Sequence, residues 1–377
     1  MNFDDIRPYR DEEVSDKIKK LFNEEQFAAV IHKVFPSLTF EQLKAQIQSI
    51  ENIKDFQKRL IVPALEGLLK QSSNGLVFDG IENLKKREAY LFVSTHRDIV
   101  LDSALMNYVL MKEDFETAEI AIGDNLMTIP WVVDLVKLNK SFIVKRNVAK
   151  EEKVQASIQL SNYINHTIKD KKNSIWIAQR SGRSKDGDDR TAQSIIKMFN
   201  LRGESNSALE NIKSLNICPV SISYEYNPCD ILTMPELMQL AKGEKYEKAP
   251  GEDVQHMAQG IQGEKGRVAV SFGEPINREL HQLEGIKNRN EICNSVAKMI
   301  DRQIHQTYHL MPTNYIAYDL LMNKSEFAEH YTEEEKTGFQ TYMESRLSQV
   351  KGDSDFVHHT FLKMYANPVI NRMAVES

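Results

Sequence analysis

Between about residues 76 and 280, short apolar runs alternate with segments of helical periodicity, and this alternation most constrains the fold. Seven runs are typical of strands because they are short and rich in β-branched or aromatic residues: GLVFDGI, AYLFVST, AEIAIG, KSFIVKR, SIWIAQ, NICPVSISYEY and GRVAVSFGEP. Helix-like segments such as DSALMNYVLMK and KEEKVQASIQLSNYINHTI lie between them. Such alternation favours crossover units, so we expect an α/β fold with a largely parallel central sheet and flanking helices.

The two ends of the chain have a helical pattern without strand-like runs. Apolar residues recur at helical spacing in TFEQLKAQIQSI, and the same period returns after Ile276. We therefore expect a helical N-terminal region at 1–75, an α/β domain at 76–280 and a helical C-terminal extension at 281–377.

Composition narrows the class of protein. The 377 residues carry a net charge of -6 at pH 7, which argues against a dedicated nucleic-acid binder. Three scattered cysteines are too few for a disulfide framework or a cysteine-based zinc site, which indicates a reducing compartment. No apolar run approaches 18 residues, and the acidic start lacks the apolar stretch of a signal peptide. We expect a cytoplasmic protein without a membrane span.

The stretch STHRDIVLDSAL, residues 94–105, holds the best candidates for chemistry. The strand before it places His96 at a carboxyl end, where open parallel sheets bind ligands. The following helix has Asp102 as its expected N-cap, so the two side chains face each other across one turn. A histidine accepts protons near neutral pH, and a carboxylate on its other ring nitrogen fixes the tautomer. Taken alone, a capping aspartate beside a surface histidine explains the same pattern.

Two other enzyme classes fit this stretch less well. A protein-kinase catalytic loop also begins His-Arg-Asp, but it needs an asparagine five residues after its aspartate, where Ser103 stands. A serine hydrolase would use Ser94 or Thr95 as the nucleophile, yet Thr95 and His96 should point to opposite faces of the strand. The chain also lacks the Gly-x-Ser-x-Gly elbow of such hydrolases.

Four blocks in order resemble the glycerolipid acyltransferases, the family of glycerol-3-phosphate and lysophosphatidate acyltransferases. The first is the His–Asp pair. The segments similar to the second, third and fourth blocks are GDNLMTIPWVVDLVKLNKSFIVKR (123–146), IAQRSGRSKDG (177–187) and ICPVSISYE (217–225). The segment VSFGEPI (270–276) is similar to the closing strand of the family's domain. The resemblance covers roughly 76–280. It implies transfer of a fatty acyl group from a thioester, either acyl-CoA or acyl carrier protein, to the hydroxyl of a phosphorylated glycerol, without a cofactor.

The resemblance also implies a role for each matching residue. His96 would be the general base, and Asp102 would orient it. Arg146 in the second block, with Arg180 and Arg183 in the third, would bind the acceptor phosphate through planar guanidinium groups.

Two further residues of the third block complete the expected site. Gly182 would let the backbone approach the ligand. Ser181 stands where the family has a glutamate that helps to hold the polar end of the acceptor.

Two departures from the family pattern leave alternatives open. Five residues separate His96 from Asp102 instead of four, so Asp98 is an alternative partner, although the expected capping role favours Asp102. Ser181 is shorter than glutamate and neutral, and Gln179 is an alternative alignment. The acceptor could therefore be an amino-acid-based lipid. A non-catalytic lipid- or acyl-carrier-binding protein on the same fold is the other alternative.

The sequence predicts no metal site, but it does predict a surface that binds a membrane. His305 and His309 lack a carboxylate at ligand spacing, which predicts a surface pair and no metal site. Five cations and no carboxylate lie from Lys137 to Lys150, which predicts a positive patch for anionic lipid headgroups or an acidic acyl carrier. We expect peripheral association with the cytoplasmic face of a membrane. The pattern leaves the oligomeric state open.

Overall fold

The computed structural model describes residues 2–35, 38–127, 129–201 and 207–376. At its centre lies a seven-stranded sheet in the order β1-β7-β6-β2-β5-β3-β4. The strands are β1 (Leu76–Asp79), β2 (Leu91–Ser94), β3 (Glu119–Gly123), β4 (Ser141–Val144), β5 (Ile175–Ala178), β6 (Ile217–Tyr224) and β7 (Val268–Phe272). Every neighbouring pair is parallel except β6 and β7. The sheet confirms the expected α/β class.

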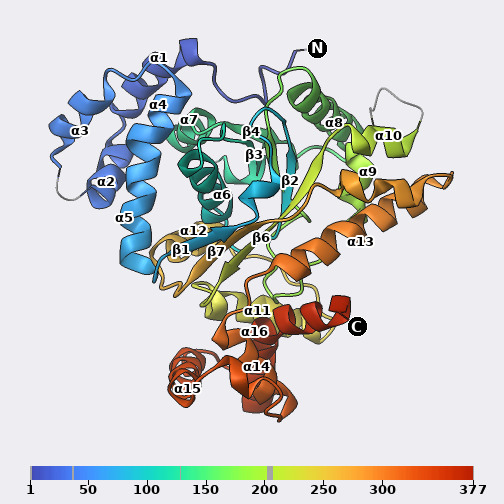
Figure 1. Ribbon diagram of the computed structural model, residues 1–377. Helices are drawn as coiled ribbons and strands as arrows, with labels where there is room; N and C mark the ends of the chain where they lie inside the picture. Colours follow the sequence, from blue (N-terminus) through green and yellow to red (C-terminus); the bar gives the residue numbers. More distant parts are fainter. Residues whose placement is uncertain (1, 36–37, 128, 202–206, 377) are drawn as a thin grey trace.

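Helices surround the sheet and fill both ends of the chain (Figure 1). They are α1 (Asp11–Leu21), α2 (Glu25–Val34), α3 (Phe40–Ile47), α4 (Ile53–Phe56), α5 (Val62–Ser72), α6 (Leu101–Lys112), α7 (Pro130–Leu138), α8 (Lys153–Lys169), α9 (Gln193–Phe199), α10 (Ala208–Lys213), α11 (Asp230–Ala241), α12 (Glu252–Gln262), α13 (Arg289–Thr307), α14 (Pro312–Met322), α15 (Glu333–Leu347) and α16 (Ser354–Glu376). Within the described residues, none of these helices is both long and apolar enough to cross a membrane.

The central strand β2 is buried on both faces. Leu91 and Val93 belong to a core that includes residues of α8, α9 and α13. Phe92 belongs to the opposite core, with residues of α5 and α6. A strand covered by helices on both sides needs apolar residues at every position, which explains the continuous run in the sequence.

Smaller apolar clusters hold the two ends of the chain. One contains residues of α1 to α4 together with Leu138 of α7. The other contains residues of α14, α15 and α16 together with Met234 of α11. Each cluster thus includes a helix from the central part, and the division at 75 and 280 stays a prediction.

Parallel pairing brings the expected blocks to one edge of the sheet. Because β2 is parallel to β5 and β6, and β3 is parallel to β4 and β5, the carboxyl ends of these five strands lie on the same side. His96 follows β2, Arg146 follows β4, and the loop from Arg180 follows β5. Tyr224 is the last residue of β6. This carboxyl edge is where ligands bind in open α/β sheets.

Candidate active site

His96 and Asp102 contact each other at the turn between β2 and α6. The Nδ1 atom of His96 lies 2.9 Å from Oδ2 of Asp102. The side chain of His96 is 16% exposed, whereas that of Asp102 is 1% exposed. The edge of the imidazole packs against Trp176, with ring centroids 5.7 Å apart. Nε2 forms no hydrogen bond with any residue that the structure describes, so it can meet a substrate hydroxyl.

The expected capping role of Asp102 is wrong. Helix α6 begins at Leu101, so Asp102 lies in its first turn. Asp98 serves the turn instead, because its Oδ1 accepts hydrogen bonds from the backbone N–H of Val100 at 2.8 Å and of Leu101 at 2.7 Å. Asp98 thus folds back on the backbone that follows it, and the helix starts two residues earlier than an N-cap at Asp102 would imply.

Four hydrogen-bonding groups converge on the Asp102 carboxylate. Besides His96, its Oδ2 accepts from the backbone N–H of Arg97 at 2.6 Å and of Asp98 at 3.0 Å. Its Oδ1 accepts from the hydroxyl of Tyr224 at 2.8 Å. These contacts fix the orientation of the Asp102 side chain beside the imidazole.

Asp98, the alternative partner, has a different environment. Burial, with the Asp102 carboxylate adding to it, raises the pKa of Asp98 above its usual range. Its Oδ2 lies so close to Gly260 of α12 that a β-carbon there would be 2.0 Å away. Of the two aspartates, Asp102 is the one hydrogen-bonded to the ring. The catalytic role of the pair stays a prediction.

The hydroxyl groups before His96 are buried and already bonded. Ser94 donates to the carbonyl of Thr95 at 2.7 Å and accepts from Trp176 at 2.8 Å. The hydroxyl of Thr95 accepts from the backbone N–H of Ile222 at 2.8 Å. Neither hydroxyl contacts the imidazole, which argues against a hydrolase with a serine or threonine nucleophile.

Arg146 lies two residues beyond the end of β4. Since β4 is three positions from β2, its end is about 14 Å from that of β2 along the carboxyl edge. Asp124 holds the backbone here by accepting from the N–H groups of Arg146 at 3.0 Å and Asn147 at 3.2 Å. A β-carbon at Gly123 would lie 2.4 Å from Oδ1 of Asn125 and 3.1 Å from Nε of Arg146, so the glycine makes room for both side chains. The Arg146 side chain is exposed and forms no ion pair with a described residue.

The loop after β5 starts nearest to His96, because β5 is the neighbour of β2. The backbone N–H of Ser184 donates to the carbonyl of His96 at 2.8 Å. Arg180 is half-buried, and it forms no hydrogen bond or ion pair with the described part of the chain. Ser181 and Gly182 are exposed. Gly182 has φ 79°, and a β-carbon there would meet nothing within 4 Å, so the glycine serves the turn.

Arg183 is buried with only 9% of the residue exposed, unlike Arg180. Its guanidinium is hydrogen-bonded to Nδ1 of His256 on α12. Burial, with the Arg183 charge adding to it, lowers the pKa of His256 to about 4. Arg183 thus connects the loop to α12, and a role as a phosphate ligand would require it to leave this contact.

Gln179, the alternative to Ser181, points into the protein. It is fully buried, and its amide nitrogen donates to Oδ1 of Asp189 at 3.4 Å. Its side-chain oxygen is buried and has no partner among the described residues. Ser181, in contrast, stands on the open side of the loop.

The five cations of the expected patch do not form one surface. Lys137 is buried, with its ammonium 5.2 Å from the centre of the Tyr9 ring, and Lys140 lies directly before β4. Arg146 and Lys150 follow the other end of that strand and are exposed. Residues that are close in the sequence are here separated by the length of β4, about 13 Å.

The expected surface pair of histidines is also wrong in part. His309 is exposed, but His305 is buried and its Nε2 lies 2.6 Å from the carbonyl oxygen of Asp189. No group of three or more potential metal ligands occurs among the described residues.

A hollow of about 1020 Å³ lies at the opposite edge of the sheet. Its lining includes Glu119 at the start of β3, Lys140 before β4 and Asn173 before β5. These residues lie at the start of β3, β4 and β5, whereas Arg146 and Arg180 follow the other ends of β4 and β5, so the hollow is not part of the candidate site.

Comparison with known proteins gives one match to a family. Residues 75–223 match the model of the family described as Acyltransferase, and this span contains β1 to β5 and all of β6 except its last residue, Tyr224. No curated protein matches the sequence. Among solved structures, the chain is similar to the 1-acyl-sn-glycerophosphate (LPA) acyltransferase PlsC from Thermotoga maritima, with 14% identity, a TM-score of 0.39 and coverage of 75% of this chain and 92% of that chain. Residues 75–223, which contain His96 and Asp102, therefore match an acyltransferase domain, and this match supports an acyltransferase enzyme.

Proposed function

We propose that the protein transfers a fatty acyl group from an acyl thioester to the hydroxyl of a phosphorylated glycerol, either glycerol-3-phosphate or lysophosphatidate. The observation that carries this proposal is the contact of 2.9 Å between His96 and a buried Asp102 at the carboxyl edge of the sheet. Two arginines without ion-pair partners among the described residues, Arg146 and Arg180, lie on the same edge.

The proposed reaction needs one proton transfer in each direction. Nε2 of His96 takes the proton of the acceptor hydroxyl while that oxygen attacks the thioester carbonyl carbon. The carbon–sulfur bond then breaks, and the leaving thiolate receives the proton from the imidazolium. A well-placed general base contributes about 10²- to 10⁴-fold to the rate.

Asp102 supports both states of the imidazole in this scheme. Its Oδ2 accepts from Nδ1–H, which leaves Nε2 free to accept the substrate proton, and its charge stabilises the imidazolium. Because Tyr224 and two backbone N–H groups hold the carboxylate, the aspartate does not have to reorganise during the reaction.

The acceptor phosphate would bind near Arg180 and Arg146. A guanidinium presents a planar fork that matches two phosphate oxygens. Arg180 starts from the strand next to His96, whereas Arg146 lies two strands farther along the edge, so Arg180 is the better placed for a short acceptor. Arg183 would support the loop from its buried position beside His256.

A second acceptor class is favoured by Ser181. Where the family has a glutamate, this chain presents a short neutral hydroxyl on the open side of the loop. An acceptor with an amino-acid headgroup, carrying its own carboxylate, would meet less repulsion there than beside a glutamate. A non-catalytic binding protein is disfavoured by the intact pair of His96 and Asp102.

We also propose peripheral association with an anionic membrane at the cytoplasmic face. Arg146 and Lys150 are exposed beyond β4, and Ile129, which is 36% exposed, lies between β3 and α7 at the same edge. A cation near such a surface contributes about 1 kcal/mol. Binding to anionic vesicles should therefore fall as salt increases. Absence of binding at low salt would count against this proposal.

Mass spectrometry of the products tests the function. The protein is incubated with palmitoyl-CoA or palmitoyl-acyl carrier protein and, separately, with glycerol-3-phosphate, lysophosphatidate or an amino-acid-based lysolipid. We expect an acylated glycerophosphate with at least one donor, and loss of that product in the His96→Ala variant. A product formed only from the amino-acid-based acceptor would replace the first proposal by the second.

A further inference from the structure

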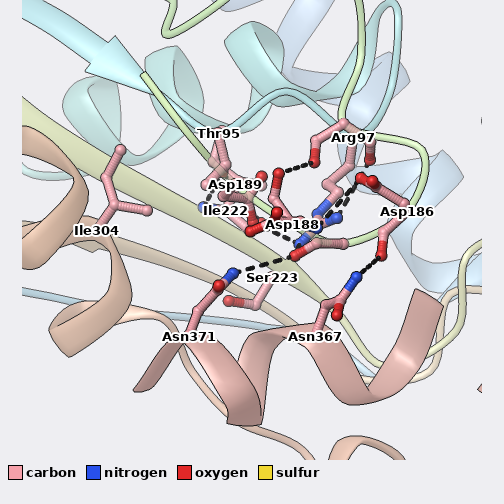
Figure 2. A network of polar contacts seen from close by, with 12 residues as sticks. Thr95, Arg97, Asp186, Asp188, Asp189, Ile222, Ser223, Ile304, Asn367 and Asn371 are labelled. Carbon is pink, nitrogen blue, oxygen red and sulfur yellow. Dashed lines mark hydrogen bonds and ion pairs between the residues drawn. The ribbon is translucent and has the colours of Figure 1, made fainter. Parts of the chain in front are cut away.

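Arg97 connects the turn that carries His96 to the loop that carries the acceptor-side residues. The loop follows β5, and Figure 2 shows its segment 186–189 between Arg97 on one side and α16 on the other. The guanidinium of Arg97 forms an ion pair with Oδ2 of Asp189 at 2.6 Å. It also donates to the carbonyls of Ser184 at 3.1 Å and Gly187 at 3.4 Å.

The ion pair is removed from solvent. The side chain of Arg97 is 12% exposed and that of Asp189 is 2% exposed. The guanidinium also lies over the ring of Tyr308, 5.5 Å from its centre. A buried ion pair adds little net stability, because desolvation opposes the attraction, but it holds the groups that it joins in one geometry.

Backbone contacts carry this geometry to the candidate base. The N–H of Arg97 donates to the same Asp102 oxygen that contacts His96. The carbonyl of His96 accepts from the N–H of Ser184 in the loop. The residue beside the imidazole and the loop are therefore joined both by backbone and by side-chain hydrogen bonds.

The C-terminal helix α16 anchors the far side of the loop (Figure 2). The amide of Asn367 donates to the carbonyl of Asp186 at 2.6 Å, and that of Asn371 to the carbonyl of Gly187 at 3.5 Å. Gly187 has φ 77°, and a β-carbon there would lie 2.2 Å from the carbonyl oxygen of Met364 on α16. Glycine at this position allows the loop to approach the helix closely.

We propose that Arg97 is a positioning residue for acyl transfer, which together with α16 fixes the distance between His96 and the acceptor-binding part of the loop, 180–182. This inference rests on the proposed function. The helical C-terminal extension would thus take part in substrate binding without touching the substrate. The open part of the loop, with Arg180 and Ser181, has no partner of its own among the described residues, so its position depends on the anchored part.

The test compares two substitutions at different distances from the site with a matched control. Arg97→Lys keeps the charge opposite Asp189 but removes the fork that reaches the two carbonyls. Asn367→Ala removes one loop anchor on α16, and Lys363→Ala changes an exposed residue of the same helix. For each protein we would measure kcat and KM for the acceptor, and hydrogen exchange of peptides covering 94–102 and 180–191.

A misplacement of about 1 Å costs on the order of 10²-fold in rate, so we expect kcat/KM for the acceptor to fall about 10- to 100-fold in Arg97→Lys and less in Asn367→Ala. The loss should reside mainly in KM for the acceptor, exchange should accelerate in 180–191 above all, and Lys363→Ala should behave as the parent.

Native kcat/KM in both variants despite faster loop exchange would overturn the positioning role, and so would unchanged loop exchange. If Arg97→Lys does not fold, Asn367→Ala decides. A parent protein that acylates no acceptor would instead refute the proposed function, and the positioning role would fall with it.

Discussion

Oδ2 of Asp102 accepts a hydrogen bond from the backbone N–H of Asp98, so the two aspartates that compete for His96 are themselves in contact, at 3.0 Å. Asp102 lies against the imidazole, while Asp98 closes the turn through the N–H groups of Val100 and Leu101. One carboxylate is therefore arranged for the ring and the other for the backbone.

Asp102→Asn should lower kcat by about 10²-fold or more, because the amide lacks the charge that stabilises the imidazolium. Its oxygen can still accept from Arg97 and Asp98, so the melting temperature should change little. Asp98→Asn is the matched control. Since burial and Asp102 already raise the pKa of Asp98, a neutral amide there should leave most of the activity. An inactive Asp98→Asn enzyme beside an active Asp102→Asn enzyme would reverse the assignment.

Gly260→Ala in α12 should disturb the same turn, because the new methyl group would collide with the side chain of Asp98. The new β-carbon would lie 2.0 Å from Oδ2 of Asp98, whose other oxygen is fixed by two hydrogen bonds, so something must shift. We expect a lower melting temperature and lower kcat. Gly67→Ala in α5 is the control, since its β-carbon meets nothing within 4 Å and alanine stabilises a helix interior by about 0.5–1 kcal/mol. Equal melting temperatures for the two variants would show that the close approach to Asp98 does not matter.

Arg180→Ala and Arg146→Ala should each raise KM for a phosphorylated acceptor, because each removes a cation from the carboxyl edge. A hydrogen bond to a charged group contributes about 1.5–3 kcal/mol, which corresponds to roughly 10- to 150-fold. Stability should not change, since neither side chain has an ion-pair partner among the described residues. Arg87→Ala, an exposed arginine before β2 at the opposite edge, should have native KM. Native KM in both edge variants would exclude this phosphate site.

His256→Gln should reduce the loss of stability in acid. In the folded protein burial and Arg183 lower the pKa of His256 to about 4, whereas an unfolded chain binds that proton near pH 6.5. The unfolded state therefore holds more protons between these values, and the stability present above pH 6.5 is lost as the pH falls toward 4.

Melting temperatures at pH 7 and pH 5 measure this effect. From pH 7 to pH 5, the melting temperature of the parent should fall by more than that of His256→Gln. The exposed variant His359→Gln should show the same fall as the parent. Identical losses in all three proteins would mean that His256 binds its proton equally well in the folded and unfolded states.

The strands and the carboxyl edge could be predicted from the sequence because both depend on local patterns. Short apolar runs such as AYLFVST marked all seven strands, and alternation with helices implied parallel pairing. The antiparallel contact of β6 with β7 was not foreseen, since α11 and α12 bring the chain back to the edge where β6 ends.

Contacts between distant segments could not be predicted in the same way. Tyr224 reaches Asp102 because β6 is the neighbour of β2, and strand order and register are not visible in one sequence. The ion pair of Arg97 with Asp189 depends on the path of a loop 92 residues away. The stretch STHRD shows that an arginine and an aspartate are present, but it gives no sign of which side chain or backbone group each of them contacts.

The most direct measurement is the rate of acyl transfer by His96→Ala beside the parent, with the acceptor that the parent uses best and with melting temperatures to confirm folding. We expect the parent to form the acylated product and the folded variant to be slower by about 10²- to 10⁴-fold. A folded His96→Ala enzyme with near-native kcat would contradict the assignment of His96 as the base.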